Sequence, residues 1–269
     1  MLSAPLPRRR RERRQQSLRH EYEQFILQRI EEFKQQLSRE QLLAIADEAV
    51  RELEVGPDEQ LVLTEVLVLE HVDRLIMHRL NLPTFRRWRG RHLRLRKAQR
   101  EPTHWGIAAD SPVAELAYEL QGEGDALVVG AAAAPVSYFL AAHDWPVVFI
   151  DQELATVESV ETRAAAEALA ARFEALVVSL GGWFPDTTPV LAVLDPVLLG
   201  RMGAAEREQF MDALTLQTIS GGVHFVLPTA PAPGVITLAP DTLMPHYEGW
   251  HVERGRADDG ARWLLAVKR

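Results

Sequence analysis

Residues 125–153 read DALVVGAAAAPVSYFLAAHDWPVVFIDQE. This segment places an apolar run at 126–129 before Gly130, then a helical stretch at 136–142 and a second apolar run at 146–150. Short apolar runs that alternate with helical stretches are typical of parallel strands joined by crossover helices. The segment therefore predicts one strand-helix-strand unit of an α/β sheet.

The same alternation extends over the C-terminal part of the chain. We expect further helices at 112–120, 157–173 and 204–218, and further strands at 175–180, 190–194 and 223–227. This order predicts a doubly wound sheet, in which ligands bind outside the carboxyl ends of the strands, where the strand order reverses. Gly130 and Asp151, which lie at the ends of the first two strands, are therefore expected at the ligand site.

The residues before this region follow a different pattern, with apolar side chains at steps of three and four. The pattern predicts helices at 18–37, at 39–53, from Pro57 to 80, and at 84–100. We therefore expect three parts: a basic arm at 1–20, a helical domain at 21–103 whose last helix is rich in arginine, and an α/β domain at 104–269.

The composition is that of a soluble globular protein, since 47% of the 269 residues are hydrophobic, 25% charged and 7% aromatic. No cysteine is present, which excludes thiol nucleophiles, cysteine zinc sites and iron–sulfur ligation. The apolar runs are shorter than the roughly 20 residues that cross a bilayer, and the basic N-terminus lacks the apolar middle of a signal peptide. We therefore expect a cytoplasmic protein without a transmembrane segment.

Charge is unevenly distributed along the chain. The first 101 residues hold 21 Lys and Arg against 16 Asp and Glu, although the whole chain has a net charge of −8. The cations gather in two clusters, one in the arm at 8–14 and one in the last predicted helix. The second cluster consists of Arg86, Arg87, Arg89, Arg91, Arg94, Arg96 and Lys97, followed by Arg100.

The arginine-rich helix allows two interpretations. Its cations can pair with acids elsewhere in the chain or lie in water, as many charged helix faces do. Alternatively, they form a contact surface for RNA phosphates, for an anionic membrane face or for an acidic protein partner. Phe85 and Trp88, which interrupt the arginines, could then stack on bases. The arm at 8–14 is expected to be a solubilising tail, because blocks of like charge repel one another and stay extended.

Three segments together resemble the class I S-adenosylmethionine-dependent methyltransferase family. Residues 125–153, which end near Asp151, stand where that family has its first strand, glycine loop, helix and second strand. Residues 190–229 are similar to its fourth strand, the following helix and the fifth strand, and residues 240–269 to its closing antiparallel hairpin. The resemblance covers about residues 104–269 and implies a Rossmann-like sheet with S-adenosylmethionine as the cofactor.

In this family the loop after the first strand binds the cofactor, and the resemblance implies that Asp151 holds the ribose hydroxyls. Family members typically carry three glycines at alternate positions of the loop, whereas this chain has Gly130, Ala132 and Ala134. Each alanine adds a Cβ where the methionine moiety and the ribose would lie. The acid expected two residues before the first glycine is replaced by Val128. These departures predict a degenerate cofactor site.

Two further positions bear on the site. Asp195 follows the fourth predicted strand, where the family often places residues near the substrate, so it is a candidate for the cofactor site; the alternative is that it caps a helix. The acid that contacts adenine in many relatives is missing after the third strand. Trp183 or Phe184 could stack on adenine there, although an aromatic residue after a strand more often belongs to the core. No residue is assigned a catalytic role.

Motifs of other chemistries are absent from the sequence. The nine histidines show no paired metal-ligand spacing, so no metal site is predicted. The sequence also lacks the G-x-S-x-G elbow of serine hydrolases and the glycine-rich phosphate-binding loop of nucleoside triphosphatases.

Two hypotheses for function follow. The first is a methyltransferase-fold protein with a degenerate cofactor site, which acts as a binding or structural component of a larger assembly through its arginine-rich helical part. It would work in the cytoplasm, peripheral to a membrane or to a ribonucleoprotein. The second is an active class I methyltransferase that uses the helical part to recognise its substrate and transfers a methyl group to a small-molecule acceptor.

Overall fold

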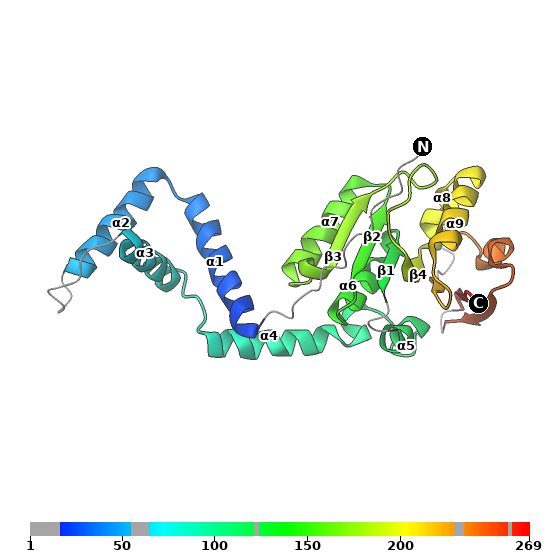
Figure 1. Ribbon diagram of the computed structural model, residues 1–269, viewed down its shortest axis with the longest axis horizontal. Coiled ribbons are helices and arrows are strands. Elements are labelled where there is room, and N and C mark those ends of the chain that lie inside the picture. The colour runs from blue at the N-terminus through cyan, green and yellow to red at the C-terminus, as the bar shows by residue number, and fades with distance from the viewer. Residues whose placement is uncertain (1–16, 55–64, 121–123, 229–233, 258–259) are drawn as a thin grey trace, which may run out of the picture. The chain divides into compact units, whose positions relative to one another are not determined.

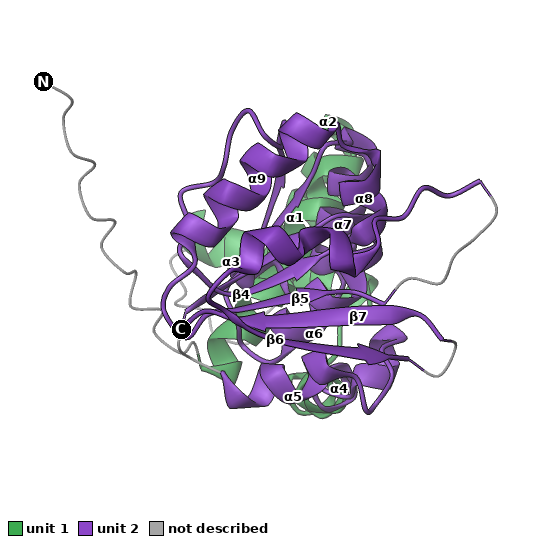
Figure 2. Ribbon diagram, turned by 90° about the vertical axis from the view of Figure 1, so that its right-hand side faces the viewer, with its two compact units in different colours: residues 1–94 green, residues 95–269 purple. Residues whose placement is uncertain are grey.

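The protein is described by a computed structural model that covers residues 17–54, 65–120, 124–228, 234–257 and 260–269 (Figure 1). Contacts between Cα atoms divide the chain into two units, residues 1–94 and 95–269 (Figure 2). The basic arm cluster at 8–14 and the predicted start of the third helix at Pro57 lie outside the described residues.

The first unit is helical, as predicted. Its helices are α1 (Leu18–Gln36), α2 (Arg39–Glu54), α3 (Glu65–Arg79) and α4 (Phe85–Gln99), and the division between the two units falls within α4. Ser38 Oγ accepts a hydrogen bond from the N–H of Gln41, and Gln41 Oε1 accepts one from the N–H of Ser38, so these two residues form a capping box at the start of α2. Among the described residues, no helix combines the length and apolarity that a membrane crossing requires.

A small core joins these helices, because each contributes apolar side chains at helical spacing. Its fully buried members include Ile30 of α1, Ile45 and Ala49 of α2, and Ile76 of α3. Trp88 of α4 packs against the same cluster and is 8% exposed. The aromatic residues of α4 therefore hold the helix in its own unit.

The second unit contains a seven-stranded sheet in the order β3-β2-β1-β4-β5-β7-β6. The strands are β1 (Asp125–Val129), β2 (Val147–Asp151), β3 (Phe173–Val177), β4 (Pro189–Leu194), β5 (Val223–Val226), β6 (His251–Arg256) and β7 (Arg262–Val267). The first five strands are parallel, whereas β7 runs antiparallel to both β5 and β6. The order reverses between β1 and β4, which confirms the predicted doubly wound sheet and its closing hairpin.

Helices cover both faces of the sheet. They are α5 (Pro112–Glu119), α6 (Ala134–Ala142), α7 (Leu154–Ala166), α8 (Pro196–Arg201) and α9 (Ala204–Gln217), with short 3-10 helices at Pro102–Trp105, Ala131–Ala133, Ala170–Arg172 and Pro240–Tyr247. The side chains of β1 alternate between two buried clusters: Val128 packs with α5, α6 and α7, whereas Leu127 and Val129 pack with α8 and α9. This alternation follows from the period of two along a strand.

The helix expected at 157–173 is shorter in the structure, where α7 ends at Ala166. Two residues later Ala168 has a left-handed backbone with φ 58°. An L-residue other than glycine seldom adopts this conformation, so the alanine-rich sequence gives no sign of the turn.

The strand expected at 175–180 is also displaced, since β3 spans Phe173–Val177. Val178 and Leu180 are almost completely buried, but they pack in the cluster of α8 and α9 rather than in the sheet. Helix α8 was not predicted, although Asp195 and Pro196 are a cap and a first-turn proline of the kind that begins helices.

Candidate functional site

The loops after β1 and β4 meet where the strand order reverses. Gly130, which directly follows β1, has φ 92°, and its N–H donates to the carbonyl of Ile150 on β2 at 3.0 Å. The N–H of Asp195, which follows β4, donates to the carbonyl of Val129 at 2.9 Å. These contacts bring the ends of β1, β2 and β4 together, as expected for a ligand site in this fold class.

Asp195 ties the two loops together through both of its carboxylate oxygens. Oδ2 accepts a hydrogen bond from the N–H of Ala132 at 2.9 Å, and Oδ1 accepts one from the N–H of Val197 at 2.7 Å. The residue is 2% exposed and is the N-cap of α8, so the capping role considered from the sequence is confirmed. Its carboxylate is thus already bonded to the chain's own backbone.

Gly130 is required by this arrangement. A Cβ at position 130 would lie 2.5 Å from Asp195 Cβ and 2.8 Å from Asp195 Oδ2. Its positive φ also disfavours any residue with a side chain. Glycine at this position therefore serves the contact between the two loops.

Asp151, at the end of β2, is 3% exposed. Its Oδ1 accepts a hydrogen bond from the N–H of Glu153 at 2.9 Å, in the turn before α7. Burial raises the pKa of the Asp151 carboxyl, and the nearby charges of Glu153 and Asp195 raise it further, while the hydrogen bond from Glu153 acts in the opposite direction. The carboxyl that the resemblance assigns to the ribose hydroxyls is therefore buried against the chain's own turn.

The two alanines of the loop have different environments. Ala132 is exposed, and its N–H is the donor to Asp195. Ala134 is 9% exposed, and its carbonyl accepts a hydrogen bond from Ser137 Oγ at 2.6 Å in the first turn of α6. Of the five predicted cofactor residues, the structure brings Gly130, Ala132 and Asp195 into direct contact and Asp151 beside them, while Ala134 lies in the buried start of the helix.

A cavity of about 150 Å³ lies between the turn at Gly181-Gly182 and α9, where Trp183, Phe184, Gln209, Phe210 and Ala213 also line it. None of the predicted cofactor residues lines this cavity. Phe184 packs on Phe210 with ring centroids 5.8 Å apart, as a core residue would. Trp183 is 54% exposed, so the expectation that it belongs to the core is wrong.

Six cations form what we call the basic face of α4. They are Arg86, Arg87, Arg89, Arg91, Arg94 and Lys97, and all six are exposed. Within the described part of the chain, none of them forms an ion pair with a carboxylate. The interpretation that they pair with acids therefore does not hold for these residues. Arg96, the remaining candidate, is half-buried and is not part of this face.

The aromatic residues of α4 point the other way. The ring of Trp88 stacks on His92 with centroids 4.5 Å apart, and His92 Nε2 lies 3.0 Å from a carboxylate oxygen of Glu21 on α1. Tyr22 of α1 packs against both Trp88 and Phe85. Stacking of these rings on bases, considered from the sequence, is therefore blocked by the packing of α4 on α1.

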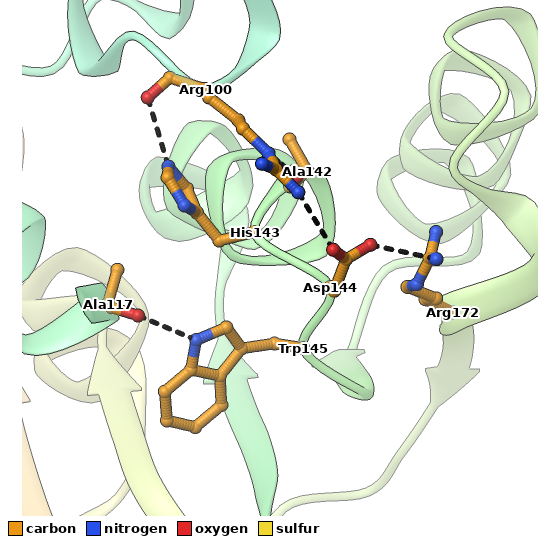
Figure 3. Close-up of polar contacts among 7 residues, drawn as sticks. All are labelled: Arg100, Ala117, Ala142, His143, Asp144, Trp145 and Arg172. Atoms are coloured by element: carbon orange, nitrogen blue, oxygen red, sulfur yellow. Dashed lines mark hydrogen bonds and ion pairs between the residues drawn. The ribbon is translucent and has the colours of Figure 1, made fainter. Parts of the chain in front are cut away.

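Arg100, which follows α4 and belongs to the second unit, is bonded to the turn before β2 (Figure 3). Arg100 donates to the carbonyl of Ala142 at 3.3 Å and to Asp144 Oδ2 at 2.8 Å, while Arg172 lies 2.8 Å from Asp144 Oδ1. His143 Nε2 is 3.0 Å from the carbonyl oxygen of Arg100, and burial lowers the pKa of His143. Arg100, unlike the basic face, thus has defined partners.

No known family model matches the chain, and no curated protein matches it. Among solved structures, it is similar to the glycopeptide N-methyltransferase MtfA complexed with sinefungin, at 14% identity over 59% of this chain and 93% of that chain, with a TM-score of 0.47. It is also similar to the N-methyltransferase NodS from Bradyrhizobium japonicum WM9, at 18% identity over 59% and 97% of the two chains, with a TM-score of 0.43. It is also similar to TehB from Haemophilus influenzae, at 14% identity over 63% of this chain and 67% of that chain, with a TM-score of 0.47.

The second unit has a Rossmann-like, doubly wound α/β fold. Five parallel strands in a doubly wound order are extended by an antiparallel hairpin, which lies beside β5 in the sheet. This is the architecture that the sequence resemblance implies for residues 104–269.

Proposed function

We propose that this protein uses a methyltransferase fold for binding rather than for methyl transfer, and that the basic face of α4 is its contact surface for a polyanionic partner. The observation that carries the first part is the bonding of Asp195. Both oxygens of this carboxylate accept hydrogen bonds from the chain's own backbone, one of them from the loop that the resemblance assigns to the cofactor.

The bonding of both acidic residues supports a degenerate cofactor site. The N–H of Ala132 is already used by Asp195, and Asp151 is buried and bonded to the N–H of Glu153. Ribose hydroxyls would meet Asp151 as a carboxylate that is 3% exposed and already bonded through Oδ1 to its own turn, so contact with that oxygen competes with the hydrogen bond from Glu153. Because a buried acceptor or donor that loses its partner is costly, S-adenosylmethionine gains little by entering.

The basic face supports the second part of the proposal. Six exposed cations without acidic partners among the described residues create a strong local field on a chain whose net charge is −8. Such a surface attracts a partner with many negative charges. It would let the protein act as a component of a larger assembly.

Calorimetric titration with S-adenosylmethionine and S-adenosylhomocysteine tests the degenerate site, with an active methyltransferase of the same fold as the control. We expect no heat of binding at ligand concentrations that saturate the control enzyme. Micromolar affinity would overturn this part of the proposal and would favour the alternative, an active methyltransferase. An Ala132→Gly/Ala134→Gly variant, which restores the glycine pattern, should also give no heat of binding, because Asp195 still forms its hydrogen bond with the loop.

Retention on a heparin column tests the contact surface. A variant with Arg86, Arg87, Arg91 and Arg94 replaced by Gln should elute at a lower salt concentration than the wild type. The matched control replaces four exposed arginines elsewhere in the first unit, namely Arg29, Arg39, Arg51 and Arg74, and changes the net charge equally. Equal elution of the two variants would show that only net charge matters and would contradict the proposal.

A further inference from the structure

We infer that the polyanion bound by the basic face of α4 is a nucleic acid duplex, held through its phosphates without readout of the bases. This inference rests on the proposed function and identifies the partner of that surface. Five features of α4 support it: the spacing of the cations, their type, the glycine at their centre, the inward packing of the aromatic residues, and the repulsion within the unbound helix.

The cations follow one side of the helix. Arg87, Arg91 and Arg94 succeed one another at steps of four and three, and Arg86 and Lys97 lie near the two ends of the same side. Eleven residue steps at 1.5 Å span roughly 16 Å. A duplex strand presents one phosphate in about 3.4 Å of axis, so four or five phosphates of one strand fall within that length. The row is therefore long enough to reach several phosphates of a duplex backbone.

The type of cation also fits phosphate. Five of the six residues of the basic face are arginines, whose planar guanidinium groups can donate two parallel hydrogen bonds to one phosphate group. A duplex offers such groups at regular intervals along both strands. Arginine is accordingly well suited to hold a phosphate backbone by bidentate contacts.

Gly90 lies in the middle of the basic face, inside the helix, where glycine is otherwise unfavourable. A Cβ placed there would meet no atom within 4 Å, so packing does not require the glycine. The residue borders an open hollow of about 560 Å³, whose other lining residues are Thr84, Arg86, Arg87, Arg91 and Arg94. The missing side chain lets a sugar-phosphate strand approach the helix backbone between the guanidinium groups.

The inward packing of the aromatic residues decides between the kinds of polyanion. Single-stranded nucleic acid is held largely by stacking of its bases on aromatic side chains, but Trp88 is 8% exposed and lies in the core with Tyr22 and Phe25. A membrane-bound helix inserts an apolar face, whereas α4 exposes only two large apolar side chains among its described residues, Leu93 at 45% and Leu95 at 37%. Charge therefore dominates the exposed surface of α4, which suits the outside of a duplex.

In the unbound protein the cations repel one another. Arg87 and Arg91, Arg91 and Arg94, and Arg94 and Lys97 are like-charged pairs at helical spacing, and the first turn of α4 contains no acid. The positive end of the helix dipole adds to the charges of Arg86 and Arg87. Phosphates placed along the row would relieve this repulsion, so binding and helix stability favour each other.

Fluorescence anisotropy of the full chain with labelled DNA and RNA duplexes of two unrelated sequences tests the inference. Because each neutralised phosphate makes the slope of log K against log salt more negative by about 0.9, the five cations of the row predict a wild-type slope of about −4.5. The variant in which Arg86, Arg87, Arg91 and Arg94 are replaced by Gln should have a slope shallower by about 3.5 units. The control variant at Arg29, Arg39, Arg51 and Arg74 should keep most of the wild-type slope.

Gly90→Ala is a second variant that separates binding from folding. It should raise the helix content or leave it unchanged and yet weaken duplex binding several-fold, because the added methyl group stands where the strand approaches. An unchanged affinity for the duplex would contradict the role of the hollow and would overturn the docking that we infer.

The outcomes also distinguish this inference from the proposed function. Tighter binding to the single strands than to the duplex, or tenfold discrimination between the two sequences, would overturn the inference. Binding to vesicles of phosphatidylserine and phosphatidylcholine without binding to duplexes would overturn it too, while the polyanion-binding function would stand. If the four-glutamine variant and the control variant bind heparin, duplexes and vesicles equally well, both the inference and the contact surface are wrong.

Discussion

The carboxylate of Asp195 accepts a hydrogen bond from the N–H of Ala132 at 2.9 Å, and this contact joins the loop after β4 to the loop after β1. The second oxygen of Asp195 caps α8 through the N–H of Val197. A residue that the sequence resemblance places at a ligand site thus stabilises the fold at the point where the strand order reverses. This relationship leads to two predictions about stability.

Replacement of Asp195 by Ala should lower the free energy of unfolding by about 2 kcal/mol, because it removes a helix cap and leaves the N–H of Ala132 without its partner. Urea unfolding followed by circular dichroism would measure the change. Asp186→Ala, at an exposed position, is the control and should stay within about 0.5 kcal/mol of the wild type. Equal stability of the two variants would show that Asp195 does not hold the loops together.

Gly130→Ala should destabilise the protein more than Gly249→Ala. Both glycines have a positive φ, 92° and 81°, so alanine is strained at either position by about 1 kcal/mol. A Cβ at 249 meets nothing within 4 Å, whereas one at 130 would lie 2.5 Å from Asp195 Cβ. Thermal unfolding of the two variants should therefore show a clearly larger loss at 130. Equal losses would mean that the loop can move away from Asp195 without cost.

The sequence predicted the sheet well because its strands are marked by residue type. Short apolar runs such as 126–129 and 190–194 fall within strands β1 and β4, and the tail forms the expected hairpin. The end of α7 could not be read, because its left-handed turn is made by Ala168 in an alanine-rich stretch. The sequence also could not show that Val178 and Leu180, which follow β3, pack in the buried cluster with α8 and α9, because that contact depends on the tertiary structure.

The sequence indicated where the candidate residues lie, but it did not indicate which hydrogen bonds they form. Strand ends indicated Gly130, Asp151 and Asp195, and the structure gathers them. The sequence could not show that Asp195 bonds Ala132, since these residues are 63 positions apart and meet only through the sheet order. A clue was available in Pro196, which follows Asp195 as the first residue of a helix and marks the aspartate as a cap.

His224 provides a prediction about pH, because it is completely buried on β5. Its Nε2 lies 2.7 Å from Thr218 Oγ1, and its Nδ1 lies 3.2 Å from the hydroxyl of Tyr247. The Thr218 hydroxyl donates to the carbonyl of Leu214, which leaves it to accept from Nε2–H, while Nδ1 accepts from Tyr247. Both ring nitrogens are thus satisfied when the imidazole is neutral.

Burial, and to a smaller extent the charge of Lys268, lowers the pKa of His224 to about 3. The unfolded chain takes up a proton near pH 6.5, whereas the folded protein does not, so stability is complete above this pH and falls as the pH drops toward 3. Below pH 6.5 this difference lowers the free energy of unfolding by about 1.4 kcal/mol per pH unit. His224 should therefore reduce the stability of the protein by about 2 kcal/mol between pH 7 and pH 5.

A His224→Gln variant isolates this effect, since the amide does not titrate while it can still bond Thr218 and Tyr247. Its stability relative to the wild type should improve by about 2 kcal/mol when the pH is lowered from 7 to 5, as measured by urea unfolding at each pH. His143, whose pKa is also lowered by burial, and Asp151, whose pKa is raised, remain in both proteins and cancel in the comparison. A difference that does not change with pH would contradict the buried neutral state of His224.

Substitution of two arginines, one on each side of the division within α4, should change the free energy of unfolding in opposite directions. Arg91 is exposed, has no ion pair in the described part of the chain, and lies at helical spacing from Arg87 and Arg94. Arg91→Gln should therefore raise the stability of the unbound protein slightly, by about 0.2–0.5 kcal/mol at low salt. Arg100→Gln should lower it by up to about 1 kcal/mol, because the ion pair with Asp144 and the bond to Ala142 are lost at a half-exposed position.

Differential scanning calorimetry at low and high ionic strength would measure both changes. Added salt should raise the melting temperature of the wild type toward that of Arg91→Gln, because it screens the repulsion that the substitution removes. A loss of more than about 1 kcal/mol on replacing Arg91 would mean that this side chain is held by an intramolecular partner. In that case the basic face would serve the stability of the chain itself, and an external polyanion would not be needed to account for its arginines.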